Sequence, residues 1–205
     1  TTSTTLALLH AAQKTAQSVR AVKPVISGFD AHDIQSDTAQ LHAMQPKLRV
    51  EEISPWRFHA ALAPHRAASL EGSSVDFAAL THWTAQQLAC AELVFVEGVG
   101  GVMVPLTHQS TVLDWMAALN LPVILVTGSY LGTLSHTLTA LVALRTRGIA
   151  VKALVMNESS HGAFPLEEAW AGLAPFIADI PLRIMQSCVA SPQEATEIHA
   201  LLEAL

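Results

Sequence analysis

The chain has 205 residues, of which 51% are hydrophobic, and its formal net charge is −6 with the histidines neutral. This length is sufficient for one well-buried domain, so we expect residues 1–205 to form a single domain. Because the lysines and arginines are scattered singly along an acidic chain, we expect neither nucleic acid nor an anionic membrane surface as a partner.

Cysteine usage and the first residues bear on the compartment of the protein. Cys90 and Cys188 lack the short spacing of a zinc or redox motif, which is typical of proteins from a reducing interior. No apolar run reaches the length of a membrane span, and residues 1–5 lack the basic and apolar regions of a secretory signal. We therefore predict a soluble cytoplasmic protein.

Hydrophobic periodicity distinguishes the predicted helices from the predicted strands, which are short β-branched or fully apolar runs. The predicted elements are, in chain order, a helix over 1–12, a strand over 19–26 with a turn at 27–28, a helix over 38–44 after a capping Ser36 or Asp37, irregular structure over 51–68 that leads to a helix, a helix over 75–89, a strand over 91–96, a helix over 112–119, a strand over 122–126, a helix over 133–147, a strand over 151–156, a short strand over 176–181 and a helix over 192–205. The chain opens on a helix with no strand before it, so we expect that an amino-terminal segment has been cut off or left out.

Strands that alternate with helices of roughly ten to fifteen residues indicate βαβ units. We therefore predict an α/β fold with a parallel sheet that is flanked by helices on both faces. Ligands of such sheets bind at the carboxyl ends of the strands, so polar residues directly after apolar runs are candidates for a functional site.

Glu97 is one such residue, because it follows the apolar run 93–96 and precedes three glycines within 98–101. A carboxylate in this position can hold a magnesium ion, while glycines let a phosphate or a substrate approach the backbone closely. The alternative is a tight turn with a solvated glutamate.

Lys23 lies inside the apolar stretch 21–26, where its charge requires an anion, so it is a candidate ligand for phosphate or carboxylate. Ser27 can add a hydroxyl to the same site, unless Lys23 is simply an edge-strand lysine before a polar turn. Asp37 taken alone is an ordinary helix N-cap. Together with Glu97 and a hydroxyl, however, it completes an oxygen set suited to magnesium in nucleotide chemistry.

Asn157 follows the predicted strand 151–156, where its amide can bind the edge of a nucleotide base or cap the next segment. The ten histidines show no spacing typical of a zinc site. No set of serine, histidine and acid supports hydrolase chemistry.

Several of these motifs follow one another in a recognisable order from about Leu6 to Pro181. The segments are Lys23-Pro24-Val25 with Ser27-Gly28, Ser36-Asp37, Ala63-Pro64-His65 with Ala67-Ala68, 96–101 with Val104-Pro105-Leu106, 122–126, and 131–136. This combination resembles the dethiobiotin synthetase family.

The resemblance implies a P-loop NTPase-like three-layer sandwich that acts as a homodimer with ATP and Mg²⁺. In the implied reaction, CO₂ adds to one amine of 7,8-diaminononanoate, ATP phosphorylates the carbamate, and the second amine closes the ring. The products are dethiobiotin, an intermediate of biotin biosynthesis, with ADP and phosphate.

The resemblance also implies roles for individual residues, of which Lys23 is the active-site lysine that neutralises the charge of carbamate and phosphate. The implied substrate contacts are Ser27, Gly98, Val99 and Gly100. The implied ATP contacts are Thr1, Thr2, Ser3, Asp37, Glu97, Asn157, Glu158, Pro181, Leu182 and Arg183. The implied metal ligands are Thr2, Asp37 and Glu97. Leu182 departs from the family, which often has an aromatic residue there.

A larger departure is at the start, where the family has a strand and a Gly-x-x-x-x-Gly-Lys-Thr loop that binds phosphates. An ungapped register places Thr2 on the loop threonine and Thr1 on the loop lysine, whereas a one-residue insertion makes Thr1 the magnesium threonine. We expect that the sequence omits this strand and loop, because an empty strand position would expose unpaired backbone. The alternatives are a catalytically degenerate dimeric binding protein that has lost the loop, or another P-loop amidoligase, for which too few residues follow Pro181 to form a glutamine-hydrolysing domain.

Overall fold

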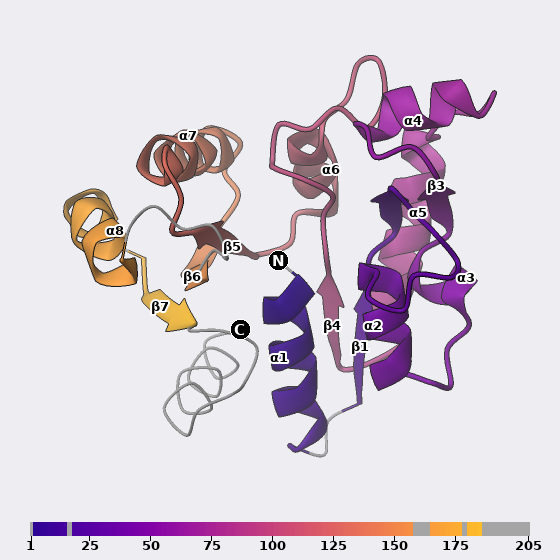
Figure 1. Cartoon of the computed structure of the whole chain (residues 1–205), viewed down its shortest axis with the longest axis horizontal. Helices are drawn as coiled ribbons and strands as arrows, with labels where there is room; N and C mark the ends of the chain where they lie inside the picture. The colour runs from indigo at the N-terminus through magenta and orange to yellow at the C-terminus, as the bar shows by residue number, and fades with distance from the viewer. Residues whose placement is uncertain (1, 16–17, 158–164, 178–179, 186–205) are drawn as a thin grey trace. The chain divides into compact units, whose positions relative to one another are not determined.

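The computed structural model describes residues 2–15, 18–157, 165–177 and 180–185, with only the backbone described for 182–185 (Figure 1). The chain divides into two compact units. The N-terminal unit comprises Thr2 and residues 4–119, and the C-terminal unit comprises Ser3 and the residues from Asn120 onward. The expected single domain stays a prediction.

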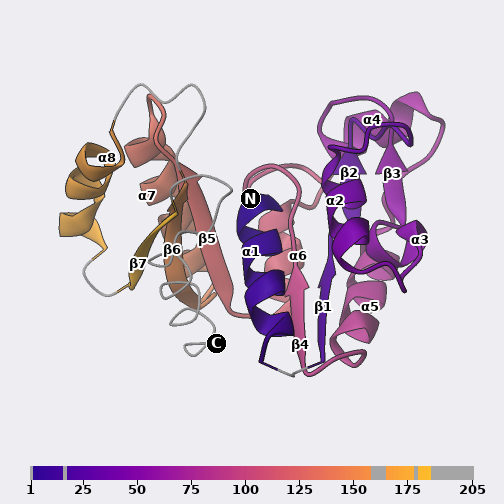
Figure 2. The ribbon, with the colours of Figure 1, turned by 60° about the horizontal axis from the view of Figure 1, so that its bottom comes forward.

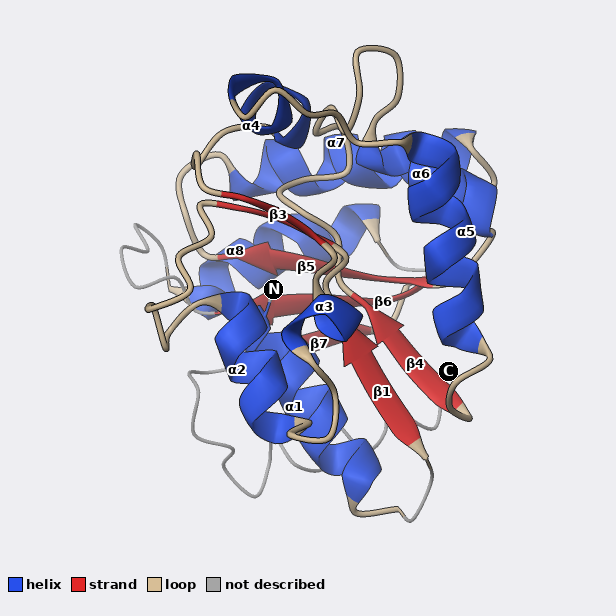
Figure 3. Ribbon diagram, turned by 90° about the vertical axis from the view of Figure 1, so that its right-hand side faces the viewer, coloured by secondary structure: helices blue, strands red, loops and turns tan. Residues whose placement is uncertain are grey.

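The N-terminal unit alternates helices with short parallel strands. Its elements are α1 (Thr2–Gln13), β1 (Val19–Val22), β2 (Val25–Ser27), α2 (Asp37–Met44), α3 (Val50–Ile53), β3 (Trp56–Phe58), α4 (Pro64–Leu70), α5 (Phe77–Leu88), β4 (Leu93–Val96) and α6 (Val112–Leu119). Strand β1 pairs with β4 and strand β2 pairs with β3, both in parallel. Figure 3 shows the β1 and β4 arrows pointing the same way.

The register of β1 and β4 determines how two of the predicted site residues lie relative to each other. Val22 lies opposite Val96, and the Glu97 backbone N–H donates to the Val22 carbonyl at 2.8 Å. Lys23 directly follows β1, and Glu97 directly follows β4. The pairing therefore brings these two charged residues to the same carboxyl edge.

Helices cover both faces of the β1–β4 pair. Successive side chains of a strand point to opposite faces. Ala21 packs with Leu9 of α1 and Leu41 of α2, whereas Val96 packs against the cluster that contains Trp115 of α6. Figure 2 shows α1 and α5 on opposite sides of these strands. The prediction of an α/β fold with parallel strands and flanking helices is confirmed.

The single strand predicted over 19–26 was wrong, because the chain changes partners at Lys23 and Pro24. Proline has no N–H to donate to a neighbouring strand. Instead, the Lys23 N–H donates to the Ile53 carbonyl at 3.0 Å, and the Pro24 carbonyl accepts from the Trp56 N–H at 3.0 Å. The irregular structure predicted over 51–68 was also wrong, since it contains α3, β3 and most of α4.

The C-terminal unit contains a parallel sheet in the order β5-β6-β7. Its elements are β5 (Val123–Gly128), α7 (Thr133–Thr146), β6 (Val151–Asn157), α8 (Leu166–Leu173), a 3₁₀ helix (Ala174–Phe176) and β7 (Leu182–Met185). The central strand β6 is deeply buried, since residues 153–156 are fully inaccessible. Helix α7 contacts β5, β6 and α8 (Figure 1).

The short strand predicted over 176–181 was wrong. Phe176 ends the 3₁₀ helix, in whose first turn Pro175 is tolerated because it lacks an N–H, and the strand begins only at Leu182. The apolar residues Phe176, Ile177 and Ile180 gave a strand-like pattern without forming a strand. The helix predicted over 192–205 lies outside the described residues. No helix within the described residues is both long and apolar enough to cross a membrane.

Candidate functional site

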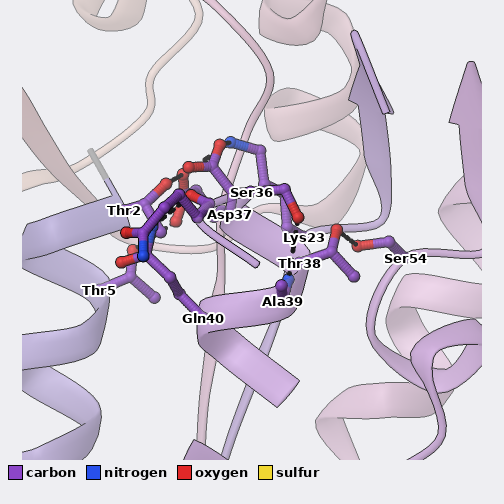
Figure 4. Close-up of polar contacts among 11 residues, drawn as sticks. Thr2, Thr5, Lys23, Ser36, Asp37, Thr38, Ala39, Gln40 and Ser54 are labelled. Atoms are coloured by element: carbon purple, nitrogen blue, oxygen red, sulfur yellow. Dashed lines mark hydrogen bonds and ion pairs between the residues drawn. The ribbon is translucent and has the colours of Figure 1, made fainter. Parts of the chain in front are cut away.

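Lys23 lies between two carboxylates at the carboxyl edge of β1 and β4. Its Nζ is 2.9 Å from Glu97 Oε1. It also forms an ion pair with Asp37 Oδ2 (Figure 4). Lys23 and Glu97 are each 6% exposed. A buried charge is tolerated only when it is paired and hydrogen-bonded, and here each charge meets that condition. A solvated Glu97 in a turn, the alternative interpretation, was therefore wrong.

Two hydroxyl groups of α1 also bind Glu97. Thr2 Oγ1 donates to Glu97 Oε1 at 2.6 Å, and Thr5 Oγ1 donates to Glu97 Oε2 at 2.8 Å. Residues three apart on a helix lie on the same face, so both hydroxyls point to the same carboxylate. The prediction had grouped Thr2 with Glu97 and had missed Thr5. The only signal for Thr5 was its place on the same helical face as Thr2, Leu9 and Ala12.

Helix α2 presents Asp37 to Lys23. Ser36 is the N-cap of α2, and its hydroxyl accepts from the Ala39 N–H at 3.3 Å. Asp37 is the first residue of the helix, where a negative charge interacts favourably with the helix dipole. Of the two capping residues that the sequence allowed, the structure uses Ser36, and the Asp37 carboxylate is left to pair with Lys23.

The two charges of the ion pair stabilise each other. Burial alone would raise the pKa of the Asp37 carboxyl, but the hydrogen bond and positive charge of Lys23 act against it, and that pKa lies below its ordinary value. Burial alone would lower the pKa of the Lys23 ammonium, but the charge of Glu97 and the hydrogen bond and charge of Asp37 raise it. Lys23 and Asp37 are therefore both charged at neutral pH.

Ser27 ends β2, four residues after Lys23. Its Oγ is buried and has no hydrogen-bond partner among the residues that the structure describes. A buried hydroxyl without a partner costs about 1–3 kcal/mol. A ligand that bonds this oxygen would remove that cost, which fits the predicted contact with substrate.

The loop after Glu97 is held in a tight conformation. Gly100 has φ +65°, and a Cβ at this position would lie 2.7 Å from Val104 Cγ2. The Val104 N–H donates to the Gly101 carbonyl at 3.0 Å, which closes the turn. Gly98, Val99 and Gly100 thus follow Glu97 directly and form a compact loop beside the charged cluster, at the place predicted for substrate contacts.

Three oxygen-bearing side chains at this edge suit a magnesium ion. No group of three or more His, Cys, Asp or Glu residues within the described ranges could by itself hold a metal ion. Magnesium, however, usually takes only one or two protein carboxylates and completes its shell with phosphate and water. Asp37, Glu97 and the Thr2 hydroxyl provide that donor set.

The residues predicted to bind the nucleotide base lie in the C-terminal unit. Asn157 ends β6 opposite Met185, whereas Leu182 and Arg183 begin β7 opposite Leu154 and Val155. Pro181 precedes β7 and is exposed. The structure therefore does not place Asn157 beside 181–183 along the strands. Ser3 is exposed on α1, and the predicted residues Thr1 and Glu158 lie outside the described residues.

Comparisons with known proteins give consistent results. The family model AAA_26, described as an AAA domain, matches residues 1–184. The ATP-dependent dethiobiotin synthetase BioD of Methylobacterium nodulans is 42% identical over 182 residues, which cover 83% of this chain and 80% of that protein. The protein of the same name from Caulobacter sp. strain K31 is 45% identical over 183 residues, which cover 86% and 78%. That of Caulobacter vibrioides is 48% identical over 158 residues, which cover 75% and 72%.

Proposed function

Because this chain belongs to the dethiobiotin synthetase family of ATP-dependent ligases, whose product serves biotin biosynthesis, we propose that it closes the ring of dethiobiotin on 7,8-diaminononanoate. In the proposed reaction, one amine of the diamine adds to CO₂ to give a carbamate. The carbamate oxygen attacks the γ-phosphorus of ATP and releases ADP. The second amine then attacks the carbamoyl carbon, phosphate leaves, and a cyclic urea forms.

The observation that carries this proposal is the buried ammonium of Lys23 at the carboxyl edge of β1 and β4. Both the carbamate and the transferred phosphoryl group are anionic, and charge develops on their oxygens during transfer. A fixed cation in a buried site stabilises such charge more than one in water does. Lys23 is held in place by Asp37 and Glu97, so its ammonium is already oriented before substrate binds.

The other residues of the site divide between metal, phosphate and substrate. Asp37, Glu97 and Thr2 would hold Mg²⁺, which when bound neutralises the charge of the phosphates. This assignment of Thr2 corresponds to the ungapped register on the family's loop threonine. Ser27 offers to the substrate a hydroxyl that has no partner among the described residues. The loop 98–100 lets the substrate approach the backbone, and Asn157 binds the adenine base.

We also propose that the protein is a cytoplasmic homodimer, as the family resemblance implies. Light scattering coupled to size-exclusion chromatography measures the molar mass in solution. A mass of twice the chain is expected, and a mass of one chain at micromolar concentration would contradict the dimer.

The test of the proposed function is direct detection of the product. Purified protein is incubated with ATP, Mg²⁺, bicarbonate and 7,8-diaminononanoate, and dethiobiotin is measured by mass spectrometry together with ADP. The control replaces the diamine with a nonanoate that carries a single amine, which cannot close a ring. The intact mass of the same sample establishes which residues are present. ADP formation without dethiobiotin in the presence of the diamine would contradict the proposal.

A further inference from the structure

Thr5 binds the oxygen of Glu97 that neither Lys23 nor Thr2 is seen to bind. Lys23 Nζ and Thr2 Oγ1 both lie within hydrogen-bond distance of Glu97 Oε1, at 2.9 and 2.6 Å. Thr5 Oγ1 donates to Oε2 at 2.8 Å. The terminal torsion of a glutamate is broad and poorly restrained by itself. Donors on both oxygens restrain the plane of the carboxylate more firmly than donors on Oε1 alone do.

The direction of the Thr5 hydroxyl is set by the packing of α1. Thr5, Leu9 and Ala12 lie on one face of the helix, and Leu9 and Ala12 are completely buried. The apolar part of this face fixes the rotation of α1 about its axis. Thr5 is itself 9% exposed and β-branched, so its side chain has few alternative rotamers. The core therefore holds the Thr5 hydroxyl against a residue 92 positions further along the chain.

We propose that Thr5 is a positioning residue, which orients the Glu97 carboxylate so that Oε1 faces the metal and the phosphates. This inference rests on the proposed function, in which Glu97 is a ligand of the metal. Partners that orient a metal ligand typically contribute about 10- to 100-fold to metal affinity or activity. Loss of the Thr5 hydroxyl is expected to weaken metal binding within that range, although Thr5 touches neither metal nor substrate.

The experiment measures metal binding without turnover. Mn²⁺, which accepts the same oxygen ligands as Mg²⁺, is titrated into the protein, and the free ion is followed by its electron paramagnetic resonance signal. Thr5→Val keeps the shape of the side chain and removes only the hydroxyl, whereas Thr5→Ser keeps the hydroxyl and removes the methyl. The matched control is Thr84→Val, because Thr84 is a fully buried helical threonine whose hydroxyl bonds only to the Leu80 carbonyl of its own helix α5 in the described contacts.

The expected result is an Mn²⁺ affinity about 10- to 100-fold lower in Thr5→Val, with Thr5→Ser and Thr84→Val close to the unsubstituted protein. Unchanged affinity in Thr5→Val would overturn the proposal, and so would a Thr5→Ser variant as weak as Thr5→Val. Thr5→Ala gives a second test if the valine variant does not fold, because alanine favours the helix.

A further variant distinguishes failure of this inference from failure of the proposed function. Glu97→Gln should weaken Mn²⁺ binding at least as much as Thr5→Val does. If Glu97→Gln binds Mn²⁺ normally, Glu97 is not a metal ligand and the proposed site itself is wrong. If Glu97→Gln is impaired while Thr5→Val is not, only the role of Thr5 is wrong. In turnover, Thr5→Val should raise the Mg²⁺ concentration for half-maximal rate and leave the KM for the diamine unchanged.

Discussion

Both units have polar side chains at or near the carboxyl ends of parallel strands, but the chemistry of these groups differs. In the N-terminal unit, the ammonium of Lys23 is paired with the carboxylates of Asp37 and Glu97. In the C-terminal unit, the cluster at the end of β5 consists of neutral hydroxyls. Thr127 Oγ1 lies 2.9 Å from Thr133 Oγ1 and 2.7 Å from Thr137 Oγ1.

This difference shows which polar clusters point to a function. Neutral hydroxyls satisfy one another and the backbone at little cost, as when Thr133 Oγ1 donates to the Gly128 carbonyl at 2.5 Å. Buried charges are expensive to desolvate, and replacing an ion pair by apolar residues is often neutral or stabilising. A buried charge cluster is therefore a stronger indication of a catalytic or binding role than a buried hydroxyl cluster. Substitutions in the two clusters can test this contrast.

The largest effect is expected for Lys23→Met, which removes the positive charge from the proposed active site. Turnover should fall by roughly two orders of magnitude or more, the scale of a fixed charge on a developing anion. Steady-state kinetics of dethiobiotin formation measures the change, and Lys152→Met, at an exposed lysine of β6, is the matched control. Turnover equal to that of the control would remove Lys23 from the mechanism.

A smaller effect is expected for Ser27→Ala. Because the Ser27 hydroxyl has no partner among the described residues, its removal should leave the free energy of unfolding unchanged or slightly higher. The KM for the diamine should rise about tenfold, which corresponds to one hydrogen bond of about 1.4 kcal/mol. A drop in stability with an unchanged KM would instead indicate a structural role.

The ion pair also predicts how stability depends on pH. The pKa of Asp37 is lower in the folded state than in the unfolded state, so its contribution is complete above the unfolded value of about 4 and is lost as the pH falls below it. The midpoint temperatures of thermal unfolding of the unsubstituted protein and of Asp37→Asn should therefore differ most at neutral pH and converge in acid. A difference that stays constant down to pH of about 2 would exclude a contribution from the charge of Asp37.

The smallest effect is expected for Thr137→Val in the neutral cluster of the C-terminal unit. Thr137 is 3% exposed and loses one hydrogen bond to Thr127 in this variant. The free energy of unfolding should fall by about 1 kcal/mol, as measured by urea denaturation, and turnover should not change. If Thr137→Val reduces turnover as much as Lys23→Met does, the contrast between charged and neutral clusters does not hold.

The sequence was informative where the signal is local. Continuous apolar runs predicted β4, β5 and β6, and helical spacing predicted α5 and α7. The partner change at Pro24 and the three-residue strand β3 were missed, because strand pairing depends on residues distant in the sequence and β3 is too short to show alternation. A proline inside an apolar run was the one local sign of the break.

The residues of the candidate site were likewise predicted where a local signal exists and missed where the contact joins residues distant in the sequence. Lys23 and Glu97 were found because a charge next to an apolar run is unusual, and the structure brings both together with Asp37. Thr5 was missed because four of the first five residues are threonine, and only its place on the helical face of Leu9 and Ala12 distinguishes Thr5 from its neighbours. Only the folded chain shows that the Thr5 hydroxyl binds Glu97.

The change of strand partners at Lys23 and Pro24 has a consequence for how the lysine works. The main chain on either side of the Lys23 side chain is tied to different elements, through the Ile53 carbonyl and the Trp56 N–H. The backbone that carries the ammonium is therefore held by helix α3 and strand β3 at once. The conformational entropy of ordering this backbone is lost when the protein folds and need not be lost again when substrate arrives. The main chain between β1 and β2 thus holds a single charge in place before substrate binds.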